Sequence, residues 1–208
     1  LRIVAEEFDY LVGFKSSTRT VIINSPDYQN IEPEFKLPEG LSRWGTFDEV
    51  PEWSGLWPQE QIISGYFTSL VNSSADRTGN ITLSCSNINN NISNPGDIFS
   101  FNQIVGERLI AKGYRAAPIF MGQKVVPGVG GGICQTASTL YNCVRDADLK
   151  VIERHPHTLK VTYVPNNMDA TVSWGGADLK FSNNKEHPIK ILITVYENYL
   201  VAAIARVN

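Results

Sequence analysis

The stretch that decides the fold of this chain is Pro127-Gly128-Val129-Gly130-Gly131-Gly132-Ile133-Cys134-Gln135. Four glycines in five positions indicate a loop whose backbone takes positive φ angles or lets another molecule approach closely. Behind the loop, apolar residues follow at helical spacing, namely Ile133, Ala137, Leu140, Tyr141, Val144 and Ala147. The pattern predicts a helix over residues 133–147 with Cys134 in its first turn.

The position of Cys134 has chemical consequences. The first N–H groups of a helix lack partners within the helix, and the dipole there is positive, so a thiolate is stabilised. We expect the pKa of Cys134 to fall from its usual value of about 8.5. The backbone around the thiol, at Gly132 and Gln135, could hold the oxyanion of an acyl-transfer intermediate. The sequence therefore predicts a nucleophile, and the alternative is a buried structural cysteine.

Ordered motifs on both sides of this stretch extend the pattern over about Gly65 to Ile193. Upstream stand Asn94-Pro95-Gly96-Asp97-Ile98-Phe99-Ser100-Phe101-Asn102, Val105-Gly106-Glu107-Arg108 and Gly113-Tyr114. Downstream stand Glu153-Arg154-His155-Pro156-His157, Tyr163-Val164-Pro165, Asp169-Ala170-Thr171-Val172 and Asp178-Leu179-Lys180-Phe181-Ser182-Asn183. With Gly130-Gly131-Gly132-Ile133-Cys134-Gln135, this series resembles the VanW-domain family. The resemblance implies an extracytoplasmic cell-wall protein of a Gram-positive bacterium, linked to glycopeptide resistance and, in some members, to L,D-transpeptidase activity on peptidoglycan.

Composition suggests how the chain is divided. The 208 residues, 42% of them hydrophobic, suffice for one core and a small extra module, and the net charge of -3 argues against a nucleic-acid surface. Residues 1–57 hold five Lys/Arg and ten Asp/Glu, whereas residues 58–208 hold thirteen and eleven. We therefore expect a Pro-rich acidic linker or arm over residues 25–57 and the VanW-like catalytic domain over residues 58–208.

Residues 1–24 resemble the tail of the copper amine oxidase N-terminal-like repeat, a stalk module of exported bacterial proteins. This segment has neither His nor Cys, so no copper site is expected there. The chain starts without Met inside a segment that is itself patterned, which suggests a fragment of a longer exported chain. No apolar run approaches the ~18 residues of a membrane span.

The order of the predicted elements indicates an α+β domain. A strand over 62–71 and a helix starting near Arg77, with Asp76 as its cap, come first. A hairpin over 118–120 and 124–126 then leads into the glycine loop. After the Cys134 helix we predict only strands, over residues 151–154, 158–164, 170–174, 179–181, 189–197 and 200–207. N-terminal helices and the glycine loop–Cys134 helix should therefore pack on a mainly antiparallel sheet.

A thiolate nucleophile usually needs a base, and two histidines are candidates. His155 and His157 alternate along an extended segment, so we expect them to face the same way. His157 matches the more constant histidine of the VanW signature and is the preferred base. Asp169 is the preferred group to orient its imidazole, with Asp178 second. The alternatives are a core or surface histidine and carboxylates that stabilise turns.

Other side chains are candidates for binding the substrate. Arg108 and Arg154 match arginines of the family and could grip a carboxylate through a bidentate fork, the alternative being an internal salt bridge. Ser138 and Tyr141, one and two turns after Cys134, can border the thiol, and Tyr114 can line the cleft. His155 and His157 with Cys134 or Asp169 could hold zinc, but no CxxC or HExxH spacing supports it. We expect no metal and no cofactor.

The VanW resemblance implies a peptidoglycan L,D-transpeptidase, and the chemistry expected of these residues fits that activity. Cys134 attacks the third residue of a stem peptide, a thioester forms, and a neighbouring amine completes a 3→3 cross-link, with His157 moving the protons. Water as the acceptor makes the same site an L,D-carboxypeptidase. The alternatives are a papain-like cysteine peptidase or amidase on the same polymer, and a non-catalytic wall-binding module.

Overall fold

The computed structural model describes residues 11–15, 20–24, 39–122 and 124–207. The chain divides into two compact units, Leu1–Lys36 and Leu37–Asn208. In the first unit the sequence predicts short strands over residues 11–14 and 20–23, and β1 (Leu11–Lys15) indeed pairs antiparallel with β2 (Thr20–Asn24). The sequence also predicts the end of a helix over residues 1–8, which lies outside the described residues. The domain boundaries at residues 24 and 57 stay predictions.

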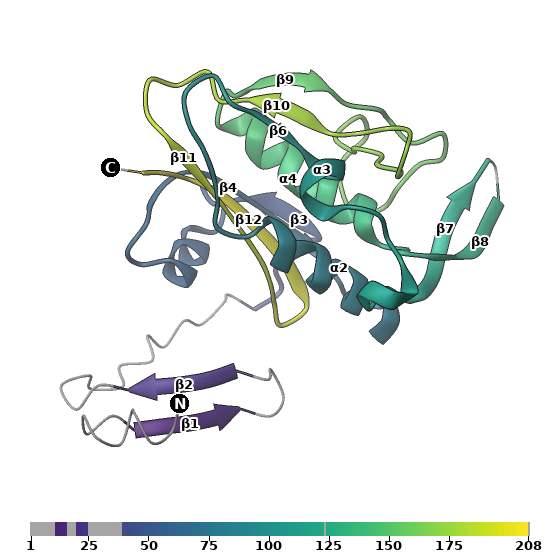
Figure 1. Ribbon diagram of the computed structural model, residues 1–208, viewed down its shortest axis with the longest axis horizontal. Helices are drawn as coiled ribbons and strands as arrows, with labels where there is room; N and C mark the ends of the chain where they lie inside the picture. The colour runs from purple at the N-terminus through teal and green to yellow at the C-terminus, as the bar shows by residue number, and fades with distance from the viewer. Residues whose placement is uncertain (1–10, 16–19, 25–38, 123, 208) are drawn as a thin grey trace. The chain divides into compact units, whose positions relative to one another are not determined.

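The second unit is built on a five-stranded antiparallel sheet. Its order is β3-β4-β12-β11-β5. The strands are β3 (Trp44–Thr46), β4 (Gln61–Ser69), β5 (Asn91–Ser93), β11 (Ile189–Tyr196) and β12 (Tyr199–Arg206). Helices α2 (Ala75–Ile88) and α4 (Ile133–Asp146) pack on this sheet and against each other (Figure 1).

A smaller antiparallel sheet lies on the other side of α4 (Figure 1). It is formed in the order β6-β10-β9 by β6 (Ile98–Ser100), β10 (Lys180–Ser182) and β9 (Lys150–Glu153). The short helices α3 (Phe101–Val105) and η2 (Ile110–Lys112) follow β6. Because α4 runs between two sheets, ten of its fourteen residues are buried, far more than on an amphipathic surface helix.

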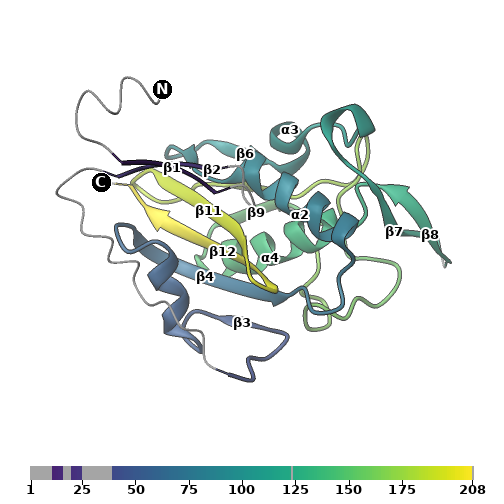
Figure 2. The same ribbon diagram turned by 90° about the horizontal axis from the view of Figure 1, so that it is seen from below.

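A two-stranded hairpin projects from the side of this unit (Figure 2). It consists of β7 (Ala116–Met121) and β8 (Lys124–Val129) and leads directly into the glycine loop and α4, as the sequence predicts. The hairpin and α2 thus approach the start of α4 from two directions. This arrangement fixes where Cys134 lies.

Residues 44–57, which belong to the expected Pro-rich linker, carry more regular structure than a linker would. They form edge strand β3 and the 3-10 helix η1 (Pro51–Leu56). Trp53 of η1 is fully buried and packs on Phe67 and Tyr199, with ring centroids 5.4 and 5.5 Å away. An aromatic side chain of this size contributes a large buried area, so it fastens this segment to the sheet.

The α+β class and the mainly antiparallel sheet are confirmed, but some expected details are wrong. Residues 158–164 and 170–174 are not strands. Ser74, not Asp76, caps α2, because its side chain accepts from the backbone N–H of Arg77. Within the described part of the chain, every helix falls short of the length and apolar character that a membrane crossing requires.

Candidate active site

The glycine loop is shaped by close packing behind it. Gly130 and Gly132 have φ angles of 82° and 106°, which side chains rarely adopt. A Cβ on Gly131 would lie 2.5 Å from the carbonyl oxygen of Ala117 in β7. A Cβ on Gly132 would lie 2.8 Å from Cγ of Arg77 in α2. The glycines therefore let the loop approach β7 and α2 inside the protein, rather than mainly leaving room for a ligand.

One buried side chain holds the loop in place. The amide of Asn80, on α2, donates to the carbonyl oxygens of Gly131 at 2.9 Å and Arg115 at 3.0 Å. Its Oδ1 accepts from the backbone N–H of Arg115 at 2.8 Å. The residue before the hairpin and the loop after it are thus tied to the same helix.

Cys134 is the second residue of α4 and is partly buried. Its Sγ donates to the carbonyl oxygen of Val172 at 3.6 Å, a bond that only the protonated thiol makes. Burial raises the pKa of Cys134, and the nearby guanidiniums of Arg108 and Arg77 oppose this without cancelling it. The lowered pKa expected from the helix N-terminus is therefore wrong for the free protein. Cys85 and Cys143 are buried, and burial raises the pKa of Cys143 to about 12.

His157 and Asp169 form a tight pair. The ring Nδ1 and the backbone N–H of His157 both lie 2.6 Å from Oδ2 of Asp169. Burial raises the pKa of Asp169, but the hydrogen bonds from His157 lower it more, so the pKa is below its ordinary value. Since Nδ1 is engaged, Nε2 is the nitrogen that can exchange a proton. The rings of Phe120 and Tyr163 meet the imidazole edge-on.

Arg154 binds the carboxylate and the backbone carbonyl of Asp169. Its Nη2 lies 3.1 Å from Oδ1 of Asp169, and its Nε donates to the carbonyl oxygen of Asp169 at 2.6 Å. Nη2 also donates to the carbonyl oxygen of Asn167, and the guanidinium lies over the ring of Tyr141. Arg154 is thus engaged by the protein itself, and Tyr141 supports it.

His155 and Asp178 lie apart from this pair. His155 is exposed and its Nε2 is 2.9 Å from Oε1 of Glu153. The expected common face for the two histidines is wrong, because residues 154–157 form no strand and the alternation of strand side chains does not apply. Asp178 accepts from the hydroxyl of Ser100 at 2.6 Å and from the backbone N–H of Asn102 at 2.9 Å.

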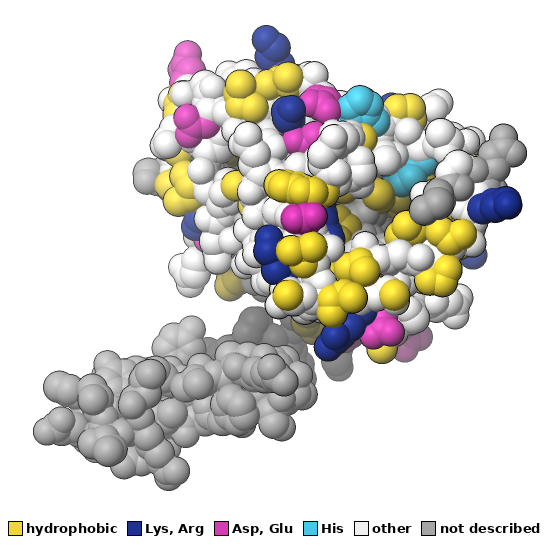
Figure 3. Space-filling model, turned by 45° about the vertical axis from the view of Figure 1, so that its right-hand side comes forward, with side chains coloured by type: hydrophobic (Ala, Val, Ile, Leu, Met, Phe, Trp, Pro, Cys, Tyr) yellow, Lys and Arg dark blue, Asp and Glu magenta, His cyan; other side chains and the backbone are white. Residues whose placement is uncertain are grey.

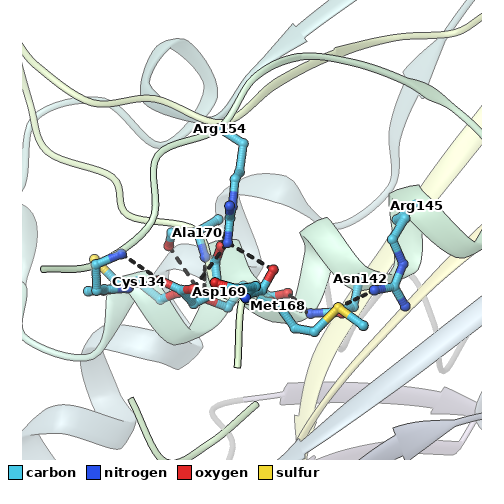
Figure 4. Close-up of polar contacts among 10 residues, drawn as sticks. Cys134, Asn142, Arg145, Arg154, Met168, Asp169 and Ala170 are labelled. Carbon is cyan, nitrogen blue, oxygen red and sulfur yellow. Dashed lines mark hydrogen bonds and ion pairs between the residues drawn. The ribbon is translucent and has the colours of Figure 1, made fainter. Parts of the chain in front are cut away.

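The segment 168–172 runs along α4 and is fastened to it by helix side chains (Figure 4). Cys134 contacts Val172, Ser138 contacts Ala170 and Asn142 contacts Met168, which Arg145 also contacts. The hydroxyl of Ser138 accepts from the N–H of Ala170 at 2.8 Å and donates to the carbonyl oxygen of Cys134 at 2.7 Å. Cys134, Ser138 and Asn142, spaced four residues apart, lie on one face of the helix. The segment is extended, but a helix takes the place of a partner strand.

A cleft of about 1180 Å³ opens at the start of α4. Cys134, His157, Arg108, Gly132 and Gln135 all line it. Five candidates do not line it. Tyr114 is buried in the core, Ser138 is fully buried, Tyr141 lies under Arg154, and Arg154 and Asp169 contact each other and reach the cleft only through His157. The backbone N–H of Gln135 donates to the carbonyl oxygen of Gly132 at 2.8 Å, so it is turned inward. Figure 3 shows histidine and hydrophobic side chains gathered on one face of this unit.

Arg77 is a cleft residue that the sequence analysis missed. Its Nη2 donates to Oε1 of Gln135 at 2.7 Å, and Nη1 donates to Ser73. The side-chain amide of Gln135 in turn donates to the hydroxyl of Thr68 and to the carbonyl oxygen of Ser69, each at 3.0 Å. Only the packing of α2 against α4 brings Arg77 to the thiol, and no local pattern signals it. Among the described residues, no group of three or more His, Cys, Asp or Glu could hold a metal ion.

Comparisons with known proteins find a family and relatives for this chain. Residues 76–205 match the family model described as VanW like protein. The chain is 45% identical over 141 residues to the uncharacterized protein YoaR of Bacillus subtilis (strain 168), covering 68% of this chain and 46% of that protein. It is 27% identical over 130 residues to the vancomycin B-type resistance protein VanW of Enterococcus faecalis (strain ATCC 700802 / V583), covering 60% and 47%.

The chain thus spans about half the length of these curated relatives. No solved structure matches it significantly. The family model covers most of the second unit, including the glycine loop, Cys134, His157 and Asp169. The chain belongs to the VanW family.

Proposed function

We propose that the second unit is a cysteine acyltransferase of the bacterial cell wall, a peptidoglycan L,D-transpeptidase that acts outside the cytoplasm. The observation that carries this proposal is one cleft that holds both the Cys134 thiol and His157, whose imidazole is oriented by Asp169. A nucleophile, a base and a group that orients the base are the parts that acyl transfer needs. Membership of the VanW family and the relative named for vancomycin resistance support the wall as the place of action.

In the first half-reaction Cys134 Sγ attacks the carbonyl carbon of the third residue of a donor stem. Nε2 of His157 takes the thiol proton and then delivers it to the nitrogen of the departing terminal D-Ala as the C–N bond breaks. A thioester remains on Cys134. The positive N-terminal end of α4 favours the negative charge that develops on the carbonyl oxygen.

In the second half-reaction the side-chain amine of a neighbouring third residue attacks the thioester. His157 removes a proton from this amine and returns it to the sulfur, which leaves as a thiol, and the new amide is the 3→3 cross-link. The cleft of about 1180 Å³ exceeds the roughly 300–1,000 Å³ typical of sites for one small ligand. Its size supports simultaneous access of a donor and an acceptor.

The raised pKa of Cys134 shapes this mechanism. A thiol that stays protonated at neutral pH needs its base in the step itself, so His157 acts during the attack rather than before it. Asp169 and Arg154 are positioning residues: Asp169 holds Nδ1, which turns Nε2 toward the cleft, and Arg154 holds Asp169.

A second candidate function is supported by a separate observation. The thiol of Cys134 donates to Val172 and thereby fastens the segment 168–172 to α4. A cysteine in that role needs no chemistry, and the unit would then be a non-catalytic wall-binding module.

Intact-protein mass spectrometry after incubation with a tetrapeptide muropeptide separates the two. We expect the protein to gain the mass of the donor minus D-Ala on the peptide that holds Cys134, and an added acceptor stem should discharge it as a 3→3 dimer. Cys134→Ala should form neither product, and His157→Ala should lose turnover while His155→Ala keeps most of it. Dimers formed by Cys134→Ala at the parent rate would remove the covalent mechanism and favour the binding module.

A further inference from the structure

Arg108 differs from every other cation around the thiol. Its side chain lines the cleft, and both terminal nitrogens are buried without a hydrogen-bond acceptor among the described residues. The guanidinium lies 5.7 Å from the centre of the Phe101 ring, and its stem packs on the glycine loop, 3.0 Å from where a Cβ of Gly130 would be. A buried guanidinium without an acceptor is costly, which is a reason to look for a ligand that supplies one.

Arg77, on α2, differs from Arg108 in its hydrogen bonding. Its guanidinium already donates to Gln135 and Ser73, so its hydrogen bonds are made within the protein. It still contributes positive charge near Cys134, as Arg108 does. The hydroxyl of Thr171 is a further buried group of this cleft with no hydrogen-bond partner in the described part of the chain. The thiol therefore lies in a cationic region in which the two terminal nitrogens of Arg108 have no hydrogen-bond acceptor among the described residues.

We propose that Arg108 binds the free carboxylate of the residue that directly follows the scissile bond, so that the donor must end one residue beyond the carbonyl attacked by Cys134. This inference rests on the proposed acyl transfer for the place of the carboxylate, but the anion site itself can be tested without turnover. A guanidinium presents two parallel N–H groups that match a carboxylate. Arg108 is then a specificity residue that distinguishes a stem with one leaving residue from a longer one.

The reason lies in what a longer stem would put at this position. A residue added after the leaving residue joins its carboxyl group in a peptide bond, so a neutral amide takes the place of the carboxylate. The new terminal carboxylate lies about 3.8 Å farther along the chain. That amide offers one carbonyl oxygen and no charge, which leaves the buried guanidinium poorly paired. A five-residue stem should accordingly be a poor donor compared with a four-residue stem.

The first experiment uses the reagents iodoacetate and iodoacetamide on Cys134, followed by peptide mass spectrometry. Both are attacked by the same thiolate with loss of iodide, so their rate ratio cancels any change in the thiol pKa. Arg108→Gln should lower the iodoacetate/iodoacetamide ratio at least about tenfold, the size expected from losing a charge-assisted hydrogen bond. Arg108→Lys, which keeps the charge but not the fork, should fall between.

Arg206→Gln is the matched control for loss of one positive charge. Arg206 is exposed at the far end of β12 from the cleft residue Tyr199, about 23 Å along the strand at ~3.3 Å per residue. The iodoacetate/iodoacetamide ratio of Arg206→Gln should equal that of the parent. A further test uses the parent protein. D-alanine should protect Cys134 from iodoacetamide, and D-alaninamide should not. Equal ratios in Arg108→Gln and the parent, or equal protection by both compounds, would overturn the anion site.

The second experiment compares tetrapeptide donors that end in a carboxylate or a carboxamide. The parent should form the acyl-enzyme at least about tenfold faster with the carboxylate, and Arg108→Gln should lose that preference by slowing the carboxylate donor far more than the carboxamide donor. Slowing of both donors alike would assign Arg108 to the oxyanion or to folding, and the proposal would be wrong. If no donor acylates the protein but the alkylation ratio still depends on Arg108, the proposed function fails while the anion site stands.

Discussion

The cleft has two walls, one carrying Cys134 and the other His157, and they differ in what holds them in place. On the Cys134 side, a glycine loop is pressed between β7 and α2 and leads into a helix buried between two sheets. On the His157 side, the chain from Arg154 to Val172 has almost no regular structure and is held by single polar side chains, chiefly Asp169 and Ser138.

Because of this difference, the residues that matter most for folding and those that matter most for the geometry of the site lie on different walls. The place of the thiol depends on backbone packing that cannot change without disturbing the core. The place of the imidazole depends on a few hydrogen bonds that can be removed one at a time. Substitutions on the first wall should therefore affect stability most, whereas substitutions on the second should disturb the site while the fold persists.

Gly131→Val should have the largest effect and would break the first wall. The new Cβ would meet the Ala117 carbonyl at 2.5 Å, and backbone atoms of β7 cannot move aside as a flexible side chain can. We expect a loss of about 3–5 kcal/mol in the free energy of unfolding, or failure to fold. Gly79→Ala is the control, because no atom lies within 4 Å of its Cβ on α2, and it should stabilise by about 0.5–1 kcal/mol. Urea unfolding within 1 kcal/mol of the parent for Gly131→Val would contradict this account of the loop.

Asp169→Asn tests the second wall. The carboxylate accepts from His157 and Arg154, and its loss should cost about 2–3 kcal/mol at neutral pH with a native circular dichroism spectrum. The folded-state pKa of Asp169 lies below its ordinary value of 3.8, so its stabilisation is present above that pH. It is lost as the pH falls through the folded-state pKa. Urea titrations at several pH values should show parent and variant converging in acid, and a constant gap would exclude Asp169 as the source.

Ser138→Ala should have a smaller effect on the same wall. Its buried hydroxyl joins α4 to the segment 168–172 through Cys134 and Ala170, and its removal should cost about 1–2 kcal/mol. Ser86→Ala is the matched control, because Ser86 donates to a carbonyl of its own helix but is exposed, and it should stay within about 0.5 kcal/mol of the parent. Equal effects of the two substitutions in thermal unfolding would mean that the segment is held by other contacts.

The same contrast explains what the sequence could predict. The helix after the glycine loop and the hairpin before it follow from local periodicity and turn residues, and both are confirmed. Residues 170–174 have the composition of a strand, yet the backbone groups of Ala170 and Val172 bond to side chains of α4. Propensity describes an extended backbone correctly there but does not specify its partner.

The candidate site divides in a similar way. The ordered motifs predict Cys134, His157 and Asp169 as site residues, and the structure brings His157 and Asp169 into contact. Arg77 reaches the cleft through the packing of two helices that are far apart in sequence, so no motif predicts it. The thiol pKa was expected in the wrong direction because the helix N-terminus is a local feature, whereas burial depends on the whole fold.

The titration of Cys134 sharpens the comparison at the point where the two walls meet. The thiol of Cys134 belongs to the first wall and donates to Val172 of the second, and burial raises its pKa above the ordinary value. Alkylation by iodoacetamide should therefore be slow at neutral pH and rise with pH through a midpoint above that of an exposed thiol. Arg108→Gln should move that midpoint further up, because the guanidinium of Arg108 opposes the effect of burial. Cys85 and Cys143 should label only after denaturation, when all three thiols become alike. A midpoint below the ordinary value would mean that the helix N-terminus outweighs burial, and the thiolate would then be formed before the substrate arrives.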